Sequence, residues 1–234
     1  MKEKIYTIPL NEAFQEGGEC PFCTLEKKLE TEQVSYSLGA SMMEPDARML
    51  SNEKGYCRRH FDMMSRETKA LSLGLVLDTH LNQLIAAIEK EKEHHEAKGG
   101  LLKKDISPLE AILEKNEQSC LICDKLHDTM EKFAQVLWYL YKRQPEFREK
   151  VLASSGFCLP HFRLLLACAH KELSGKELKE AKQEIIDLEL SHLKRINEEV
   201  NWFTKKFDYR YQDEPWKNSK DAPARAMEKL AKFL

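Results

Sequence analysis

The sequence "CPFC" at residues 20–23 is followed by "GYCRRH" at residues 55–60, and the chain later repeats this pair as "CLIC" at residues 120–123 and "GFCLPH" at residues 156–161. The second Cys-x2-Cys lies 100 residues after the first, and the second Cys-x2-His lies 101 residues after the first. Both Cys-x2-His motifs follow a glycine and an aromatic residue and precede a phenylalanine. This self-similarity predicts an internal duplication with one residue inserted in one copy.

A Cys-x2-Cys turn brings two thiolates to one ion, and a Cys-x2-His at a helix start adds a third sulfur and an imidazole nitrogen. Four protein ligands leave no position for a reactive water, so the pattern predicts structural zinc, two ions per chain, and disfavours a zinc-activated hydrolase. We expect each half to be stapled by its own Cys3His site. The predicted ligands are Cys20, Cys23, Cys57 and His60 in the first copy and Cys120, Cys123, Cys158 and His161 in the second.

Three other interpretations of the six repeated cysteines stay open. Soft ligands also suit an iron-sulfur cluster, and closely spaced thiols suit redox chemistry. Buried cysteines repeated by descent without any metal would give the same pattern. The seventh cysteine, Cys168, lies in the apolar run "HFRLLLACAH" and is predicted to be a small buried side chain.

The composition limits the class of protein. The 234 residues are 42% hydrophobic and 32% charged, which suits a soluble chain with a real core. The 37 basic and 39 acidic residues nearly cancel, so no overall field attracts nucleic acid or an anionic membrane. We expect no signal peptide and no stretch that approaches a membrane span of roughly 18 uninterrupted apolar residues. The prediction is a cytoplasmic protein, whose reduced thiols point to metal or redox roles rather than disulfides.

Few glycines and prolines and no strand-type alternation predict an all-α fold. Paired glycines and a proline in "KGGLLKKDISP" indicate a linker, and Ser107 and Pro108 resemble a helix start. We expect four segments: a first metal-binding helical repeat at 1–98, a linker at 99–108, a second repeat at 109–207, and a C-terminal extension packing on the repeats at 208–234.

Several other residues allow a functional and a structural interpretation. Arg48 and Arg148 precede the third cysteine of each copy and are predicted to support the metal site or a helix end, or to bind an anionic ligand. His80 and His192 lie on the long helices after the metal motifs, where packing or surface positions are favoured over a second site. Packing is likewise favoured for the aromatic cluster at 138–142, and a solvated surface for His94 and His95.

The chain resembles a family of uncharacterised bacterial proteins, found mainly among Firmicutes and grouped as a domain of unknown function. The resemblance rests on "ECPFC", "SMMEPDARMLSNEKGYCRRHF", "QPEFREK", "GFCLPHF" and the tail "EPWKNSKDAPARA", and it covers almost the whole chain. It implies a bacterial protein and carries no activity with it.

Two classes of function follow. The favoured one is a non-enzymatic, zinc-stapled helical protein that binds a protein partner or a small ligand, because no nucleophile and base pair is recognisable. The alternative is a regulatory protein that responds to oxidants or metal by releasing zinc or by using an iron-sulfur cluster. Nucleic-acid binding is weaker, since the basic residues are interleaved with acids.

Overall fold

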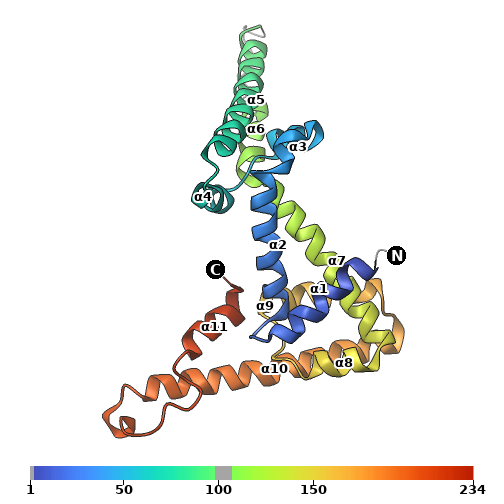
Figure 1. Ribbon diagram of the computed structural model, residues 1–234, viewed down its shortest axis with the longest axis vertical. Coiled ribbons are helices and arrows are strands. Elements are labelled where there is room, and N and C mark those ends of the chain that lie inside the picture. The colour runs from blue at the N-terminus through green and yellow to red at the C-terminus, as the bar shows by residue number, and fades with distance from the viewer. Residues whose placement is uncertain (1–2, 98–106, 234) are drawn as a thin grey trace. The chain divides into compact units, whose positions relative to one another are not determined.

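The computed structural model describes residues 3–97 and 107–233, and every regular element in this part of the chain is helical (Figure 1). The all-α prediction is confirmed. The α-helices are α1 (Glu3–Glu16), α2 (Pro21–Ser37), α3 (Pro45–Lys54), α4 (Arg58–Arg66), α5 (Ala70–Ala97), α6 (Ser107–Gln118), α7 (Leu121–Arg143), α8 (Pro145–Leu152), α9 (Leu159–Cys168), α10 (Gly175–Lys205) and α11 (Ala222–Ala231). Short 3-10 turns are η1 (Ala40–Met43), η2 (Ala169–Lys171) and η3 (Tyr209–Tyr211).

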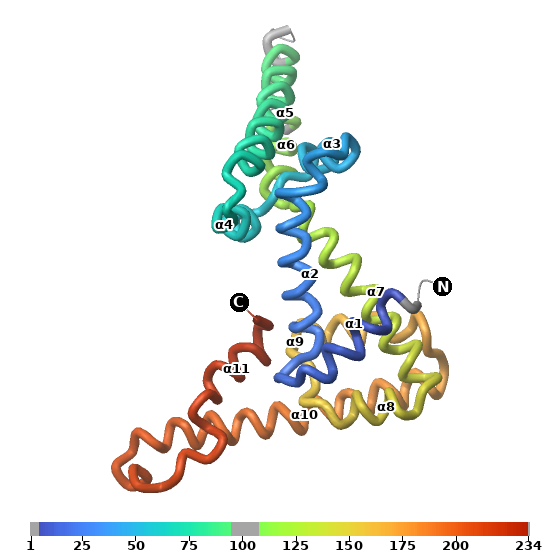
Figure 2. The backbone as a smooth tube through the Cα atoms, in the orientation of Figure 1, coloured from blue at the N-terminus to red at the C-terminus, as the bar shows by residue number. Residues whose placement is uncertain are grey.

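The chain folds into two compact units whose limits differ from those of the sequence copies. Unit 1 comprises Met1–Lys28 and Asp128–Leu234, and unit 2 comprises Leu29–His127. Figure 2 shows the path: the chain leaves unit 1 along α2, forms unit 2, and returns along α7. Each unit therefore joins part of one copy to part of the other. The predicted linker falls mostly on residues 98–106, outside the described part, and α6 begins at Ser107 as expected.

The two units repeat one order of local elements. A short helix with proline in its first turn comes first, at Pro45 in α3 and Pro145 in α8. Proline suits this position because its fixed φ is helical and its missing N–H has no partner to lose. A glycine with positive φ follows, Gly55 at 61° and Gly156 at 76°. The chain then enters the Cys-x2-His helix and a long helix. Gly55 directly ends α3, whereas α8 ends at Leu152 and Gly156 lies in the loop that follows.

Each unit has its own core. In unit 2 the buried core side chains are Val34, Leu38, Tyr56, Met64, Val76, Cys120, Leu121, Ile122 and Leu126. In unit 1 the largest fully buried apolar side chains are Phe22, Trp138, Phe157, Leu10, Leu137, Leu165 and Ile185. The ring of Phe22 packs at 5.7 Å from that of Phe157. Each phenylalanine directly precedes a predicted metal ligand, Cys23 or Cys158. The Cys-x2-Cys and the Cys-x2-His of unit 1 are therefore both part of its core.

Helix α5 corrects the expectation that no stretch approaches a membrane span. Of the described helices, one segment, Ala70–His94, is long and apolar enough to cross a membrane by length and composition only, and 6% of its most apolar part is buried. The polar residues Asp78, Thr79 and His80 interrupt its apolar run. A mostly buried core helix of a soluble protein can have the same length and composition, but this segment of α5 is largely exposed.

Candidate metal centres

The eight predicted ligands form two groups, and each group combines residues from both sequence copies. Cluster 1 consists of Cys20, Cys23, Cys158 and His161, all buried. Cluster 2 consists of Cys57, His60, Cys120 and Cys123. Within each cluster, the candidate ligand atoms all lie within 4.8 Å of one another. Two Cys3His groups able to hold a metal ion are therefore present in the described part of the chain.

The expectation that each half completes its own site is wrong, and helix α2 gives the reason. It begins at Pro21, within the first Cys-x2-Cys, and is continuous for 17 residues, a length of about 25 Å. The segment that bears Cys57 follows the end of this helix and belongs to unit 2. It meets the Cys-x2-Cys at the start of α7, which lies in the same unit. Equal spacing in the two copies is compatible with either pairing.

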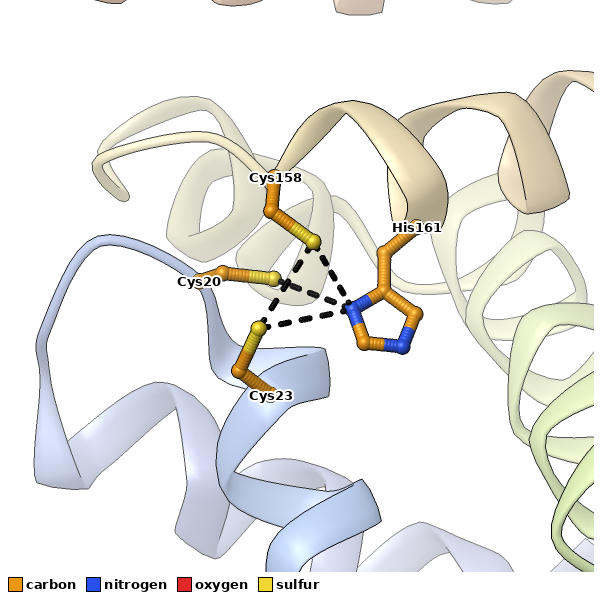
Figure 3. A group of neighbouring side chains, drawn as sticks. All are labelled: Cys20, Cys23, Cys158 and His161. Atoms are coloured by element: carbon orange, nitrogen blue, oxygen red, sulfur yellow. Dashed lines mark hydrogen bonds between the residues drawn. The ribbon is translucent and has the colours of Figure 1, made fainter. Parts of the chain in front are cut away.

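Two helix starts converge on each cluster. In Figure 3, Cys20 and Cys23 approach from the start of α2, while Cys158 and His161 approach from the start of α9. The same holds for α7 and α4 in cluster 2. Cys57 and Cys158 occupy the residue just before their helices with extended backbone, and the histidine follows in the first turn. The positive end of a helix dipole favours thiolates at this position.

The distances in cluster 1 suit a single tetrahedral ion. His161 Nδ1 lies 3.5 Å from Cys20 Sγ, 3.6 Å from Cys23 Sγ and 3.1 Å from Cys158 Sγ. Cys23 Sγ lies 3.6 Å from Cys158 Sγ. Metal bonds of about 2.3 Å to sulfur and about 2.0 Å to nitrogen place tetrahedral ligands about 3.5 to 3.8 Å apart.

Cluster 2 has the same geometry. His60 Nδ1 lies 3.2 Å from Cys57 Sγ, 3.2 Å from Cys120 Sγ and 3.5 Å from Cys123 Sγ. Cys57 Sγ and Cys123 Sγ are 3.8 Å apart. Both histidines thus turn Nδ1 toward the sulfurs, and both clusters have the donor set and spacing of a closed four-ligand site.

A carboxylate and a cation support each histidine from behind. His60 Nε2 lies 3.1 Å from Glu30 Oε1, and Arg59 donates to both Glu30 oxygens at 3.0 and 2.9 Å. In cluster 1, His161 Nε2 lies 3.2 Å from Glu26 Oε2, and Lys232 donates to Glu26 Oε1 at 2.6 Å. A carboxylate behind Nε2 places the imidazole proton there, which leaves Nδ1 for a metal.

The pKa shifts reflect this crowding of ligands. Burial opposes ionisation of Cys20, yet hydrogen bonds from Cys158, Cys23 and His161 keep its pKa well below the ordinary value. Hydrogen bonding with Cys158 and Cys20 and burial raise the pKa of Cys23. In cluster 2 a hydrogen bond from Cys123 lowers the pKa of Cys120 to about 3 against the effect of burial. Each cluster thus favours a thiolate next to a protonated thiol.

The histidines are held protonated by their neighbours. Burial alone would lower their pKa values, but the thiolates and Glu30 raise that of His60 to about 10, and the thiolates and Glu26 raise that of His161 to about 11. A metal ion that binds either cluster must displace the imidazole proton and the remaining thiol protons.

Metal affinity is therefore expected to rise with pH. Protons compete with the metal below the raised histidine pKa values, and each displaced proton changes the affinity about tenfold per pH unit. The stability that a metal contributes is present at high pH and is lost as pH falls. Competition with a chromophoric chelator between about pH 6 and pH 8 measures this slope. An affinity independent of pH would contradict ligation through these groups.

Substitution of the supporting carboxylates is expected to weaken the metal sites separately. Glu26→Gln should lower metal affinity at cluster 1, and Glu30→Gln at cluster 2, by about 10- to 100-fold, because the amide stabilises the imidazole less. Chelator competition on each variant measures the loss. Glu32→Gln, at an exposed position of the same helix, is the matched control and should keep wild-type affinity. Equal behaviour of all three variants would exclude a supporting role.

The structure places the remaining predicted site residues outside both clusters. Arg148 pairs with Glu184 and lies over the ring of Tyr141 at 5.4 Å to its centroid. Arg48 lies at the matching position of α3, where its amide donates to Glu44 O at 3.0 Å. Both arginines lie on the short helix that precedes the glycine, and their predicted ligand binding stays a prediction.

The two long-helix histidines lie near the glycine turns. His80 Nδ1 is 2.7 Å from Asn52 O, and a Cβ at Gly55 would lie 2.8 Å from His80 Cε1. Burial and nearby Lys229 and Arg195 lower the pKa of His192, which accepts from Arg195 Nε at 3.2 Å. Both histidines thus have partners within the fold, and the packing interpretation stays a prediction.

The structural interpretations of three further features are confirmed. Trp138 is fully buried and donates to Leu165 O at 2.9 Å, so the 138–142 cluster is largely core. Cys168 is buried at 2% exposure. His94 is exposed at the end of α5, and the side chain of His95 lies outside the described part.

The carboxylates Glu26 and Glu30 and the cations Arg59 and Lys232 were not expected from the sequence. Glu26 follows Cys23 by one helical turn, but the equivalent position after Cys123 is Leu126. Both carboxylates come from α2, although they support histidines in different clusters. Of these four residues, only Arg59 could have been suspected from the sequence, because it lies next to the predicted ligand His60 in "CRRH".

The family model that matches the chain is described as a family of unknown function, DUF6062, and it covers residues 1–234. No curated protein and no solved structure matches the chain.

Proposed function

The chain belongs to DUF6062, a family of unknown function, so its role has to come from its own geometry, and we propose that it is a non-enzymatic helical protein stapled by two structural zinc ions. The observation that carries this is the closed Cys3His geometry of both clusters. Four protein ligands fill a tetrahedral site, which leaves no position where a zinc-bound water could react. Each ion would join two helix starts that are far apart in sequence and so contribute directly to folding.

Zinc is favoured over an iron-sulfur cluster by the ligand spacing. The four ligands of an iron–sulfur cluster are divided among two or more iron atoms, so as a set they lie further apart than four ligands of one ion. The sulfur pairs at 3.6 and 3.8 Å match one ion. Thiolate and imidazole ligands around one tetrahedral ion favour zinc among the common metals.

Elemental analysis with a visible spectrum, on protein purified under reducing, anaerobic conditions, tests this proposal. We expect close to two zinc per chain and no visible band. Replacing zinc by cobalt should give the absorption of tetrahedral thiolate coordination. Iron with a broad charge-transfer band would overturn zinc in favour of redox chemistry, and absence of any metal would overturn both.

The cellular role proposed is binding of a protein partner or a small ligand by a soluble, cytoplasmic bacterial protein. Nucleic acid is disfavoured because the chain carries 37 basic and 39 acidic residues. Retention of a labelled DNA or RNA at low salt that disappears as salt rises would argue against this exclusion.

A further inference from the structure

The two clusters share a ligand set but differ in exposure. In cluster 1 the three cysteines are between 0 and 3% exposed. In cluster 2 Cys120 is 3% exposed, whereas Cys57 is half-buried and Cys123 is exposed. Solvent therefore reaches two of the three cysteines of cluster 2. Because access and thiolate character decide which cysteines react, the same coordination chemistry is protected in one site and open in the other.

We propose that Cys123 and Cys57 form a peroxide-sensitive modification site, through which cluster 2 releases its zinc while cluster 1 keeps it. This inference rests on the proposed function, because it requires a metal in each cluster. The geometry that carries it is the 3.8 Å separation of the Cys57 and Cys123 sulfurs together with their exposure.

The chemistry proceeds in two steps with a peroxide as oxidant. The Cys123 sulfur, which a bound zinc ion would hold as a thiolate, attacks one oxygen of hydrogen peroxide, the O–O bond breaks, and the products are a sulfenic acid on Cys123 and hydroxide. The Cys57 thiolate then attacks the Cys123 sulfur, the S–O bond breaks, and a second hydroxide leaves as the disulfide forms. The two thiolates lose two electrons and the peroxide gains them. Only Cys120 and His60 of cluster 2 would then remain to hold a zinc ion, which would dissociate.

Cluster 1 offers the competing route within the same molecule. Cys23 borders a cavity of about 430 Å³, also lined by Lys27, Thr24 and Lys232. Its side chain is nevertheless 3% exposed, and its partner at 3.6 Å, Cys158, is fully buried. An oxidant that reached Cys23 through this cavity would find no exposed second thiolate. The rate of zinc release from cluster 1 therefore serves as an internal control for the rate from cluster 2.

The test uses the full-length protein with hydrogen peroxide and a chromophoric zinc chelator. Zinc content is measured first, and a value well below two per chain would overturn the proposed function and this inference with it. With two zinc bound, we expect one equivalent to leave at least about tenfold faster than the second. The chelator without peroxide gives the background rate, which is subtracted.

Mass spectrometry after alkylation and proteolysis assigns the fast phase. A Cys57–Cys123 disulfide, formed while the cysteines of cluster 1 stay protected, is the expected result. Release of both equivalents at one rate, or first oxidation at Cys23, would overturn the inference while leaving structural zinc intact. A Cys120–Cys123 disulfide would overturn the assignment of Cys57. Cys168→Ser is the control variant and should leave both phases unchanged.

Discussion

Cys20→Ser is expected to remove one of two zinc ions and to loosen unit 1 while leaving unit 2 folded. The free energy of unfolding should fall by at least about 3 kcal/mol, because loss of one thiolate weakens a metal whose binding energy is folding energy. Hydrogen exchange should accelerate in α8 and α9, which adjoin Cys158, and stay slow in α3 and α4. The same loss of stability is expected for Cys158→Ser.

The matching variant in cluster 2 separates the observed pairing from the one expected by sequence copy. Cys120→Ser should accelerate exchange in α3 and α4 and spare α8 and α9. If each copy held its own metal, the two variants would exchange these effects, and Cys20→Ser would loosen residues 45–66. Cys168→Ser makes the same chemical change at a buried cysteine outside both clusters and should retain two zinc. Unchanged metal content and melting temperature in Cys20→Ser would contradict a structural metal.

The sequence was sufficient to predict the eight residues of the two clusters and insufficient to predict which of them pair. Thiol and imidazole spacing is local, so Cys-x2-Cys and Cys-x2-His identify ligand pairs before any fold is known. Which Cys-x2-Cys meets which Cys-x2-His depends on the paths of α2 and α7. Because the two copies have nearly the same spacing, the sequence is compatible with sites within each copy and with sites shared between copies. The carboxylates had no local signal, because Glu30 reaches a histidine 30 residues away in sequence.

The helical fold was predictable for a related reason. Proline at a helix start, as at Pro145, and glycine at a helix end, as at Gly55, act through local backbone geometry that the residue type itself determines. The burial of a charged side chain, by contrast, has no local sequence pattern that predicts it. Lys229 and Glu189 lie in helices that read as amphipathic and solvated, yet their side chains are 0% and 1% exposed.

Lys229→Met is expected to lower the free energy of unfolding by about 3 to 5 kcal/mol, because it leaves a buried carboxylate without its cation. Lys229 Nζ donates to Ser155 O at 2.5 Å and Phe157 O at 3.0 Å, and lies 3.5 Å from Glu189 Oε1. Glu189 in turn accepts from the Phe157 amide at 2.8 Å. This pair fixes the turn that presents Cys158, so zinc affinity at cluster 1 should fall as well. Urea unfolding and chelator competition measure the two losses.

The loss should also depend on pH. Burial raises the pKa of Glu189, and Lys229 opposes that rise. Without the lysine, the pKa of Glu189 in the folded protein lies further above its value in the unfolded chain. Between these two pKa values the folded state binds more protons than the unfolded state, so the free energy of unfolding falls as pH increases. Relative to wild type at each pH, the loss should be smaller near pH 5 than near pH 8.

Two further variants separate the buried charge from simple loss of a side chain. Lys220→Met removes an exposed lysine from the preceding turn and should change stability by less than about 0.5 kcal/mol. The double variant Lys229→Met/Glu189→Gln removes both charges, while the amide still accepts from the Phe157 amide. It should recover part of the stability and abolish the pH dependence, because no titratable group remains in the pair. A double variant as unstable as Lys229→Met at pH 8 would show that the lysine acts through its bonds to the Ser155 and Phe157 carbonyls, and that the charge of Glu189 contributes little to the turn.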